Sequence, residues 1–188
     1  MIRLALLDDD LAGLRRLLEA DRGLEILAAA PDPATLARHL DGRRPDVLVL
    51  EYDPVRGEAL ELCWRLKCRA GAPRVLLYTA HVTPALAIAA RAAGFDGLVG
   101  KGVSAPVLSA AIRRVAAGES VLPTVLHHDF EDVVERLADE DLATFALLLD
   151  DVDAQDVAAR LRLSEHDADR RVLRVLNRIR PRRQREPR

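Results

Sequence analysis

Short apolar runs alternate with amphipathic segments over residues 1–118 of the chain. Five of the runs are continuously apolar, which is typical of strands buried on both faces of a parallel sheet. These runs lie at residues 2–7, 24–29, 47–50, 74–78 and 97–100. Segments with apolar residues at helical spacing follow each run. They predict helices at residues 11–20, 32–40, 57–70, 84–93 and 104–117. The alternation predicts an α/β domain with a doubly wound, five-stranded parallel sheet.

The ends of the predicted helices carry capping signals. Asp32 stands at an N-cap position and Pro33 at the first helical position, where the missing N–H of proline costs nothing. Gly94 and Gly118 follow two other helices and can close them in the left-handed conformation. These signals support the predicted order of the elements.

Polar residues stand where four of the predicted strands end. Asp8 and Asp9 follow the first strand, Glu51 the third, Thr79 the fourth and Lys101 the fifth. Each has a simple interpretation alone, such as a solvated turn, a helix cap or a surface charge. Ligands of such sheets bind at the carboxyl ends of the strands. The five side chains together therefore predict a functional site at one edge of the sheet.

Residues 1–118 resemble the receiver domain of bacterial two-component response regulators. The matching segments are RLALLDDD (3–10), PDVLVLE (45–51), VLLYTA (75–80), GFDGLVGK (94–101) and AIRRVAAGE (111–119). In that family an acidic pair holds Mg²⁺, an aspartate that ends the third strand accepts a phosphoryl group, and a threonine and a lysine hold the phosphoryl oxygens. The resemblance implies that Asp8 and Asp9 correspond to the metal pair, Thr79 to the threonine and Lys101 to the lysine.

Glu51 occupies the position of the phosphoryl acceptor in this resemblance. Its carboxylate stands on a stem one methylene longer, about 1.5 Å further out. Misplacement of a reacting group by about 1 Å can cost ~10²-fold in rate. We therefore expect no phosphotransfer at Glu51, and expect its carboxylate either to imitate a phosphorylated aspartate or to pair with Lys101. The same substitution argues against the Mg²⁺ and the cognate histidine kinase that the resemblance implies.

Two further positions bear on the switching chemistry. Asp53 lies two residues beyond Glu51 and is the alternative acceptor, although its side chain is expected to point out of the pocket. Leu98 stands three residues before the lysine, where many receivers carry a Tyr or Phe that swings inward on activation. It is interpreted either as a loss of ordinary switching or as drift at a position that tolerates aliphatic residues.

A second, helical domain is predicted at residues 133–180, after a linker at 119–132. Helical periodicity returns from Leu137, a second helix spans 152–161, and a turn at 162–164 leads into a third helix at 164–180. Two helices joined by a tight turn predict a helix-turn-helix. Residues 156–179 resemble the LuxR-type DNA-binding domain that follows receivers in the NarL/FixJ class. The third helix has one apolar stripe, formed by Ala168, Val172, Val175, Leu176 and Ile179.

Seven polar residues of this third helix are the predicted DNA-binding set. They are His166, Asp167, Asp169, Arg170, Arg171, Arg174 and Arg178. Asp167 and Asp169 stand where LuxR-type domains usually carry Thr and Lys; Asp151 and Gln155 replace the usual Gly and Lys around the second helix. An aspartate can accept from cytosine N4, or it can be a solvated residue favoured by the helix dipole. The sequence leaves both interpretations open.

Charge is distributed unevenly over this second domain. The whole chain of 188 residues has a formal net charge of −2. Residues 129–169 contain fourteen acidic residues and three arginines, whereas residues 170–188 contain nine arginines and one glutamate. The arginine-rich tail at 181–188 is either a segment that follows DNA phosphates or a solubilising end.

Composition narrows the class of protein. No apolar stretch approaches the ~20 residues of a membrane span, and Cys63 and Cys68 match no metal or redox spacing. We therefore expect a cytoplasmic protein without a membrane partner. The expected function is that of an atypical, phosphorylation-independent response regulator: a homodimeric, DNA-binding transcription regulator and not an enzyme. The alternatives are a protein-interaction module that has lost DNA binding, or a conventional kinase-driven regulator that uses Asp53.

Overall fold

The computed structural model describes residues 1–53, 58–150, 152 and 154–181. The chain divides into two compact units. The first unit consists of residues 1–52, 71–82 and 95–122, and the second of residues 53–70, 83–94 and 123–188. The predicted arginine-rich tail beyond residue 181 and the predicted departure at Asp151 lie outside the described residues.

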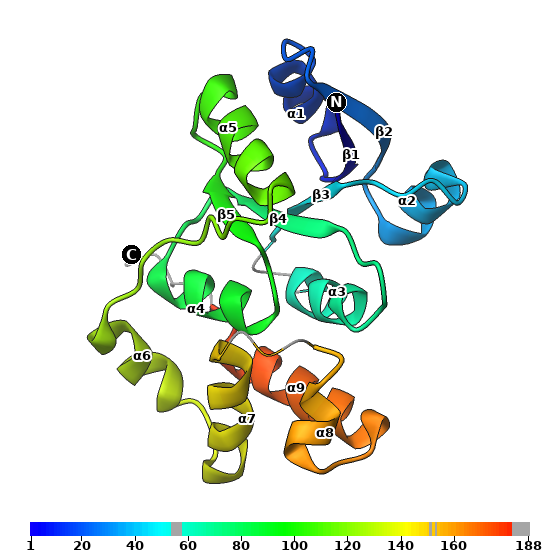
Figure 1. Ribbon diagram of the computed structural model, residues 1–188. Helices are drawn as coiled ribbons and strands as arrows, with labels where there is room; N and C mark the ends of the chain where they lie inside the picture. The colour runs from blue at the N-terminus through cyan, green and yellow to red at the C-terminus, as the bar shows by residue number, and fades with distance from the viewer. Residues whose placement is uncertain (54–57, 151, 153, 182–188) are drawn as a thin grey trace. The chain divides into compact units, whose positions relative to one another are not determined.

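The first unit contains a five-stranded sheet with the order β2-β1-β3-β4-β5, in which every pairing is parallel (Figure 1). Its strands are β1 (Ile2–Leu7), β2 (Leu24–Ala30), β3 (Val47–Glu51), β4 (Arg74–Thr79) and β5 (Gly97–Gly100). The prediction of a doubly wound, five-stranded parallel sheet is confirmed, and each strand lies within one residue of its expected bounds. All five strands therefore end at the same edge of the sheet.

Three helices belong to the first unit: α1 (Leu11–Leu18), α2 (Pro33–Leu40) and α5 (Ala105–Ala116). Their N-caps are Asp10, Asp32 and Ser104, so the predicted cap at Asp32 is confirmed. The aliphatic side chains of β1, β3 and β4 form a core with those of α1 and α5, as expected for strands with continuous apolar runs. This core holds the carboxyl ends of the strands in fixed register.

Among its described residues, the second unit contains helices and connecting turns but no strand. Its helices are α3 (Glu58–Lys67), α4 (Pro84–Ala92), α6 (His127–Val134), α7 (Asp139–Leu149), α8 (Val157–Leu161) and α9 (Glu165–Ile179). Helix α4 buries six of its nine residues, including five in a row from Leu86 to Ala90. A helix buried on so many sides needs several partners, and within this unit α4 packs against α6, α7 and α9.

Helices α8 and α9 form the predicted helix-turn-helix. Arg162 ends α8 in the left-handed conformation, with φ of 55°, and the Ser164 hydroxyl accepts from the backbone N–H of Asp167 at the start of α9. All five residues of the predicted apolar stripe of α9 are buried. Helix α8 is shorter than the predicted helix at 152–161, because residues 154–156 form a turn before it.

Helix α6 begins inside the segment at 119–132 that the sequence indicated as a linker and ends two residues beyond it. The Asp129 carboxylate accepts from the backbone N–H of Leu126 and so satisfies one free donor at the start of the helix. Val133 is fully buried, which anchors the helix by its apolar face. His127 and His128 are thus the first residues of a helix, not part of an extended connection.

Candidate functional site

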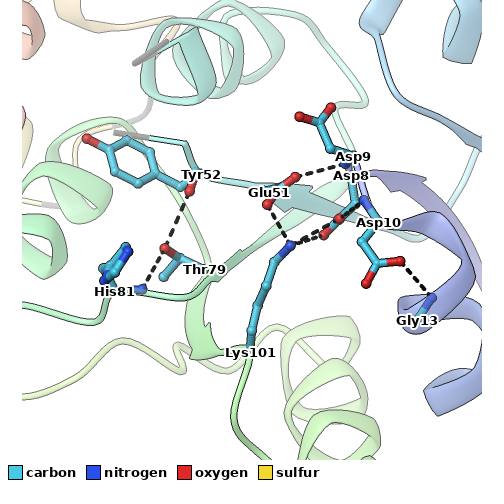
Figure 2. Close-up of polar contacts among 9 residues, drawn as sticks. All are labelled: Asp8, Asp9, Asp10, Gly13, Glu51, Tyr52, Thr79, His81 and Lys101. Atoms are coloured by element: carbon cyan, nitrogen blue, oxygen red, sulfur yellow. Dashed lines mark hydrogen bonds and ion pairs between the residues drawn. The ribbon is translucent and has the colours of Figure 1, made fainter. Parts of the chain in front are cut away.

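Three charged side chains meet at the carboxyl edge of the sheet (Figure 2). Lys101 follows β5, and its Nζ atom lies 2.5 Å from Glu51 Oε1 and 3.1 Å from Asp8 Oδ1. Glu51 is the last residue of β3, and Asp8 follows β1 directly. The lysine ammonium therefore bridges two carboxylates that would otherwise repel each other.

Backbone amides complete the coordination of these carboxylates. The N–H of Asp9 donates to Glu51 Oε2 at 2.8 Å, and the N–H of Asp10 donates to Asp8 Oδ1 at 2.7 Å. Both oxygens of Glu51 consequently have donors, one charged and one from the backbone. From the end of β3, the Glu51 side chain reaches both the backbone N–H of Asp9 and the ammonium of Lys101. The pairing with Lys101, one of the two expected roles of Glu51, is therefore present.

Burial and pairing act against each other on the pKa values of this cluster. Burial raises the pKa of Glu51, but the Asp9 amide and the Lys101 ammonium more than offset it, so the pKa lies below its ordinary value. Burial prevails at Asp8, whose pKa is raised although Lys101 opposes the shift. The pKa of Lys101 is raised, because its two carboxylate partners outweigh its own burial. Glu51 and Lys101 are thus an ion pair at neutral pH.

Thr79 is buried in the same region but is turned to the backbone. Its hydroxyl donates to the carbonyl oxygen of Tyr52 at 3.4 Å and accepts from the backbone N–H of His81 at 3.2 Å (Figure 2). Leu98, at the predicted switch position, is also buried, and its backbone N–H donates to the carbonyl of Val121. The Thr79 hydroxyl and the Leu98 backbone are therefore both engaged by backbone groups of the first unit.

Asp53 and the aspartates of the first loop differ in placement. Asp9 has an exposed side chain and contributes its backbone amide to the Glu51 carboxylate. Asp53 is half-buried, two residues beyond the end of β3. The structure therefore brings Asp8, Glu51 and Lys101 together through side chains, and Asp9 through its backbone.

The residues at this edge do not fit a Mg²⁺ ion well. Magnesium is held by one or two carboxylates together with several waters, in octahedral geometry. Here the Asp8 and Glu51 carboxylates already accept from the Lys101 ammonium and from backbone amides. Among the described residues, no group of three or more His, Cys, Asp or Glu is placed to hold a metal ion.

The sequence did not indicate two supporting residues. The Lys101 ammonium lies 5.4 Å from the centre of the Tyr78 ring, within the range of a cation–π interaction. Asp10 caps α1, with its carboxylate accepting from the N–H of Gly13. The alternation of side chains along β4 is the sequence signal that could have placed Tyr78 beside the pocket. Asp10 was not recognised as a helix cap because it is the last of three consecutive aspartates.

Two arginines of α9 are held by a buried acid of α7. Arg178 donates to Asp141 Oδ2 at 2.6 Å, and Arg174 donates to Asp141 Oδ1 at 2.6 Å. Asp141 has no exposed surface, so its charge depends on these donors. Both arginines were predicted to bind DNA, and the structure gives them a role in joining α7 to α9.

The remaining predicted DNA-binding residues are also partly engaged. Asp167 accepts from Ser164 and from Arg170, each at 2.7 Å, and these contacts lower its pKa. Asp169 Oδ1 accepts from the indole Nε1 of Trp64 at 3.0 Å. His166 has an exposed side chain and Arg171 a half-exposed one.

The comparisons with known proteins agree with the fold of the first unit. The family of response regulator receiver domains matches residues 6–113, which is more than half of the chain. The chain belongs to the response regulator receiver family. The suspected relationship to response regulators of the NarL/FixJ class is therefore confirmed. The family match covers the receiver part, and the similarity to a full-length relative also covers the helical part.

Three relatives illustrate the similarity. The DNA-binding transcriptional activator DevR/DosR of Mycobacterium tuberculosis is 28% identical over 192 residues, covering 95% of this chain and 88% of that protein. A two-component response regulator of the LuxR family from Aurantimonas is 28% identical with a TM-score of 0.58, covering 71% of this chain and 99% of that chain. The RcsB response regulator of Salmonella typhimurium, at 17% identity and a TM-score of 0.56, shares the fold over 95% of this chain and 93% of its own.

Proposed function

We propose that this response regulator works without phosphorylation and acts as a DNA-binding transcription regulator. The observation that carries the first part is the bridge from Glu51 through Lys101 to Asp8. The lysine that would hold a phosphoryl oxygen is already neutralised by the carboxylate at the acceptor position. The permanent pair of Lys101 with Glu51 thus takes the place of the transient pair that a lysine forms with a phosphoryl oxygen.

Acetyl phosphate with Mg²⁺ provides the direct test of this part. We expect no gain of one phosphoryl mass in the intact protein, because a glutamate carboxylate bound to an ammonium and an amide is a poor nucleophile in the wrong position. Asp53→Asn is the matched variant, since Asp53 is the alternative acceptor. A stable phosphoryl adduct that disappears in Asp53→Asn would support the conventional, kinase-driven regulator instead.

The second part, DNA binding, is supported by the helix-turn-helix formed by α8 and α9. DevR/DosR, similar over nearly the full chain, is described as a DNA-binding transcriptional activator. Selection of bound fragments from a genomic library tests this function. Reproducible enrichment of particular fragments at moderate salt supports it, and the absence of any enrichment contradicts it.

A partner-docking module is the second candidate function. It is favoured by the engagement of five of the seven predicted DNA-binding side chains with other residues of the chain. On this candidate the protein acts in the cytoplasm through its receiver and its acidic helices, and it has no catalytic activity. Retention of a protein partner by variants that bind no DNA would support the docking module.

None of the helices in the described part of the chain has the length and hydropathy of a membrane span.

A further inference from the structure

Helix α7 exposes an apolar face. Residues 142–149 read LATFALLL, in which only Thr144 is polar, and Thr144 is fully buried. The exposed residues of this stretch are Leu142, Ala143 and Ala146. Ala146 lies four positions after Leu142 and three after Ala143, so the three side chains share one side of the helix. A helix whose central turns have no polar residue on the outer side normally packs against a partner there.

The opposite side of α7 already has its partners. Phe145 and Leu148 are buried on that side, and Asp141 accepts from two arginines of α9. Within the second unit, α7 packs against α4, α8 and α9. The exposed face is therefore additional to the packing of the unit, and the described residues leave it uncovered.

Acids flank the exposed face at both ends of α7. Asp139 and Glu140 stand in the first turn, Asp150 is the C-cap residue, and the last turn carries no basic residue. All three acids are exposed. A carboxylate near the amino end of a helix is favoured by the helix dipole, but one at the carboxyl end opposes it. Within the described part of the chain, neither Asp139 nor Asp150 has an ion-pair partner. The charge of Asp150 therefore does not stabilise α7.

These acids argue against three classes of occupant for the exposed face. In an isologous pair of α7 helices, the acids of one copy would meet the acids of the other, whether the helices run parallel or antiparallel. The phosphates of DNA and the headgroups of an anionic membrane would likewise be repelled. The occupant therefore has to be apolar along its centre and positively charged at its ends.

We infer that the exposed face of α7 is a docking surface for a basic, amphipathic helix of a partner protein. Apolar residues of that helix cover Leu142 and Ala146, and its lysines or arginines meet Asp139 and Asp150. The 11 residues of α7 span about 16 Å, which is the separation that these basic residues need. The inference rests on the partner-docking candidate and names its surface and the chemistry of its partner.

A labelled peptide tests this surface on the full chain. The probe is a fluorescein-labelled peptide of leucine and lysine, about four helical turns long, with its leucines at helical spacing; its counterpart has glutamate in place of each lysine. We expect fluorescence anisotropy to show binding of the lysine peptide alone. Ala146→Arg should weaken this binding at least about tenfold, since it places a like charge and a long side chain in the contact. Ala37→Arg is the matched control: it makes the same change at an exposed alanine of α2 and should bind like wild type.

Asp150→Asn tests the contribution of charge. We expect it to weaken peptide binding about twofold to fivefold, as for loss of a surface ion pair, and to reduce the salt dependence of binding. The melting temperature should stay unchanged or rise, because the variant removes a charge that opposes the helix dipole; a purely structural role of Asp150 would lower it. Glu19→Gln is the control, since Glu19 is an exposed acid at the C-cap of α1, and it should bind the peptide like wild type.

The outcomes separate the docking surface from the function on which it rests. No binding of the lysine peptide, or equal weakening by Ala146→Arg and Ala37→Arg, would overturn α7 as the docking surface. Conversion of a dimer to a monomer by Ala146→Arg alone, without peptide, would assign the face to a second copy of the chain instead. The partner-docking candidate fails separately, if variants that bind no DNA retain no protein partner while the peptide still binds at α7.

Discussion

A single methylene distinguishes Glu51 from the aspartate that receivers carry, and its effect is visible in the pairing with Lys101. The two side chains are 23% and 25% exposed and 2.5 Å apart. A double-mutant cycle with Glu51→Ala and Lys101→Ala measures their coupling in the free energy of unfolding. We expect about 2 kcal/mol, between the ~0–1 of exposed pairs and the ~3–5 of buried ones. The exposed Glu61 and Arg65 pair is the control, at about 0.3–0.5 kcal/mol. Zero coupling at Glu51 would show a tolerated acid in an inactive pocket.

The pH dependence of stability follows from the lowered pKa of Glu51. Burial acts to raise this pKa, but the Asp9 amide and Lys101 prevail and lower it. A carboxyl with a lowered folded pKa contributes stability above its unfolded pKa, about 4.3, and loses it as the pH falls through the folded value. The advantage of wild type over Glu51→Gln in urea unfolding should therefore be constant from about pH 6 to 8 and shrink below about pH 4. An advantage that persists unchanged at lower pH would contradict this assignment.

At the scale of elements, α7 and α9 are joined through a charge that cannot be left unpaired. Asp141 is fully buried and accepts from Arg174 and Arg178. The double variant Arg174→Ala/Arg178→Ala should lower the free energy of unfolding by about 3–5 kcal/mol, because it strands a buried carboxylate. Arg171→Ala, on the same helix, should change it by less than about 0.5 kcal/mol. Chemical denaturation decides the matter, and a small loss in the double variant would mean that water reaches Asp141.

The sequence predicted elements wherever the signal was local. Continuous apolar runs gave the strands, Asp32 gave a helix start, and residues at strand ends converged because parallel strands end at one edge. Helix α6 was missed because its apolar anchor, Val133, stands among acids and histidines. The partner of Asp169 was also missed, because Trp64 is 105 positions away and no periodicity relates them. The pairing of Asp141 with Arg174 and Arg178 was missed for the same reason.

At the scale of the whole molecule, the expected homodimer has to use a surface that the fold leaves open. The apolar stripe of α9 does not supply this surface, because its five residues are buried within the second unit. Helix α5 does offer an exposed aliphatic side chain, Val107, which is 53% exposed. Since the Glu51 and Lys101 pair needs no phosphoryl group, we expect a dimer in light scattering without any phosphorylating agent. Val107→Lys should shift it to monomer by placing like charges across an isologous interface. Val82→Lys is the matched control, since Val82 is similarly exposed, at 48%, but lies outside α5. A monomeric wild type at tens of micromolar, or equal dissociation by both variants, would mean that α5 is not the dimer surface.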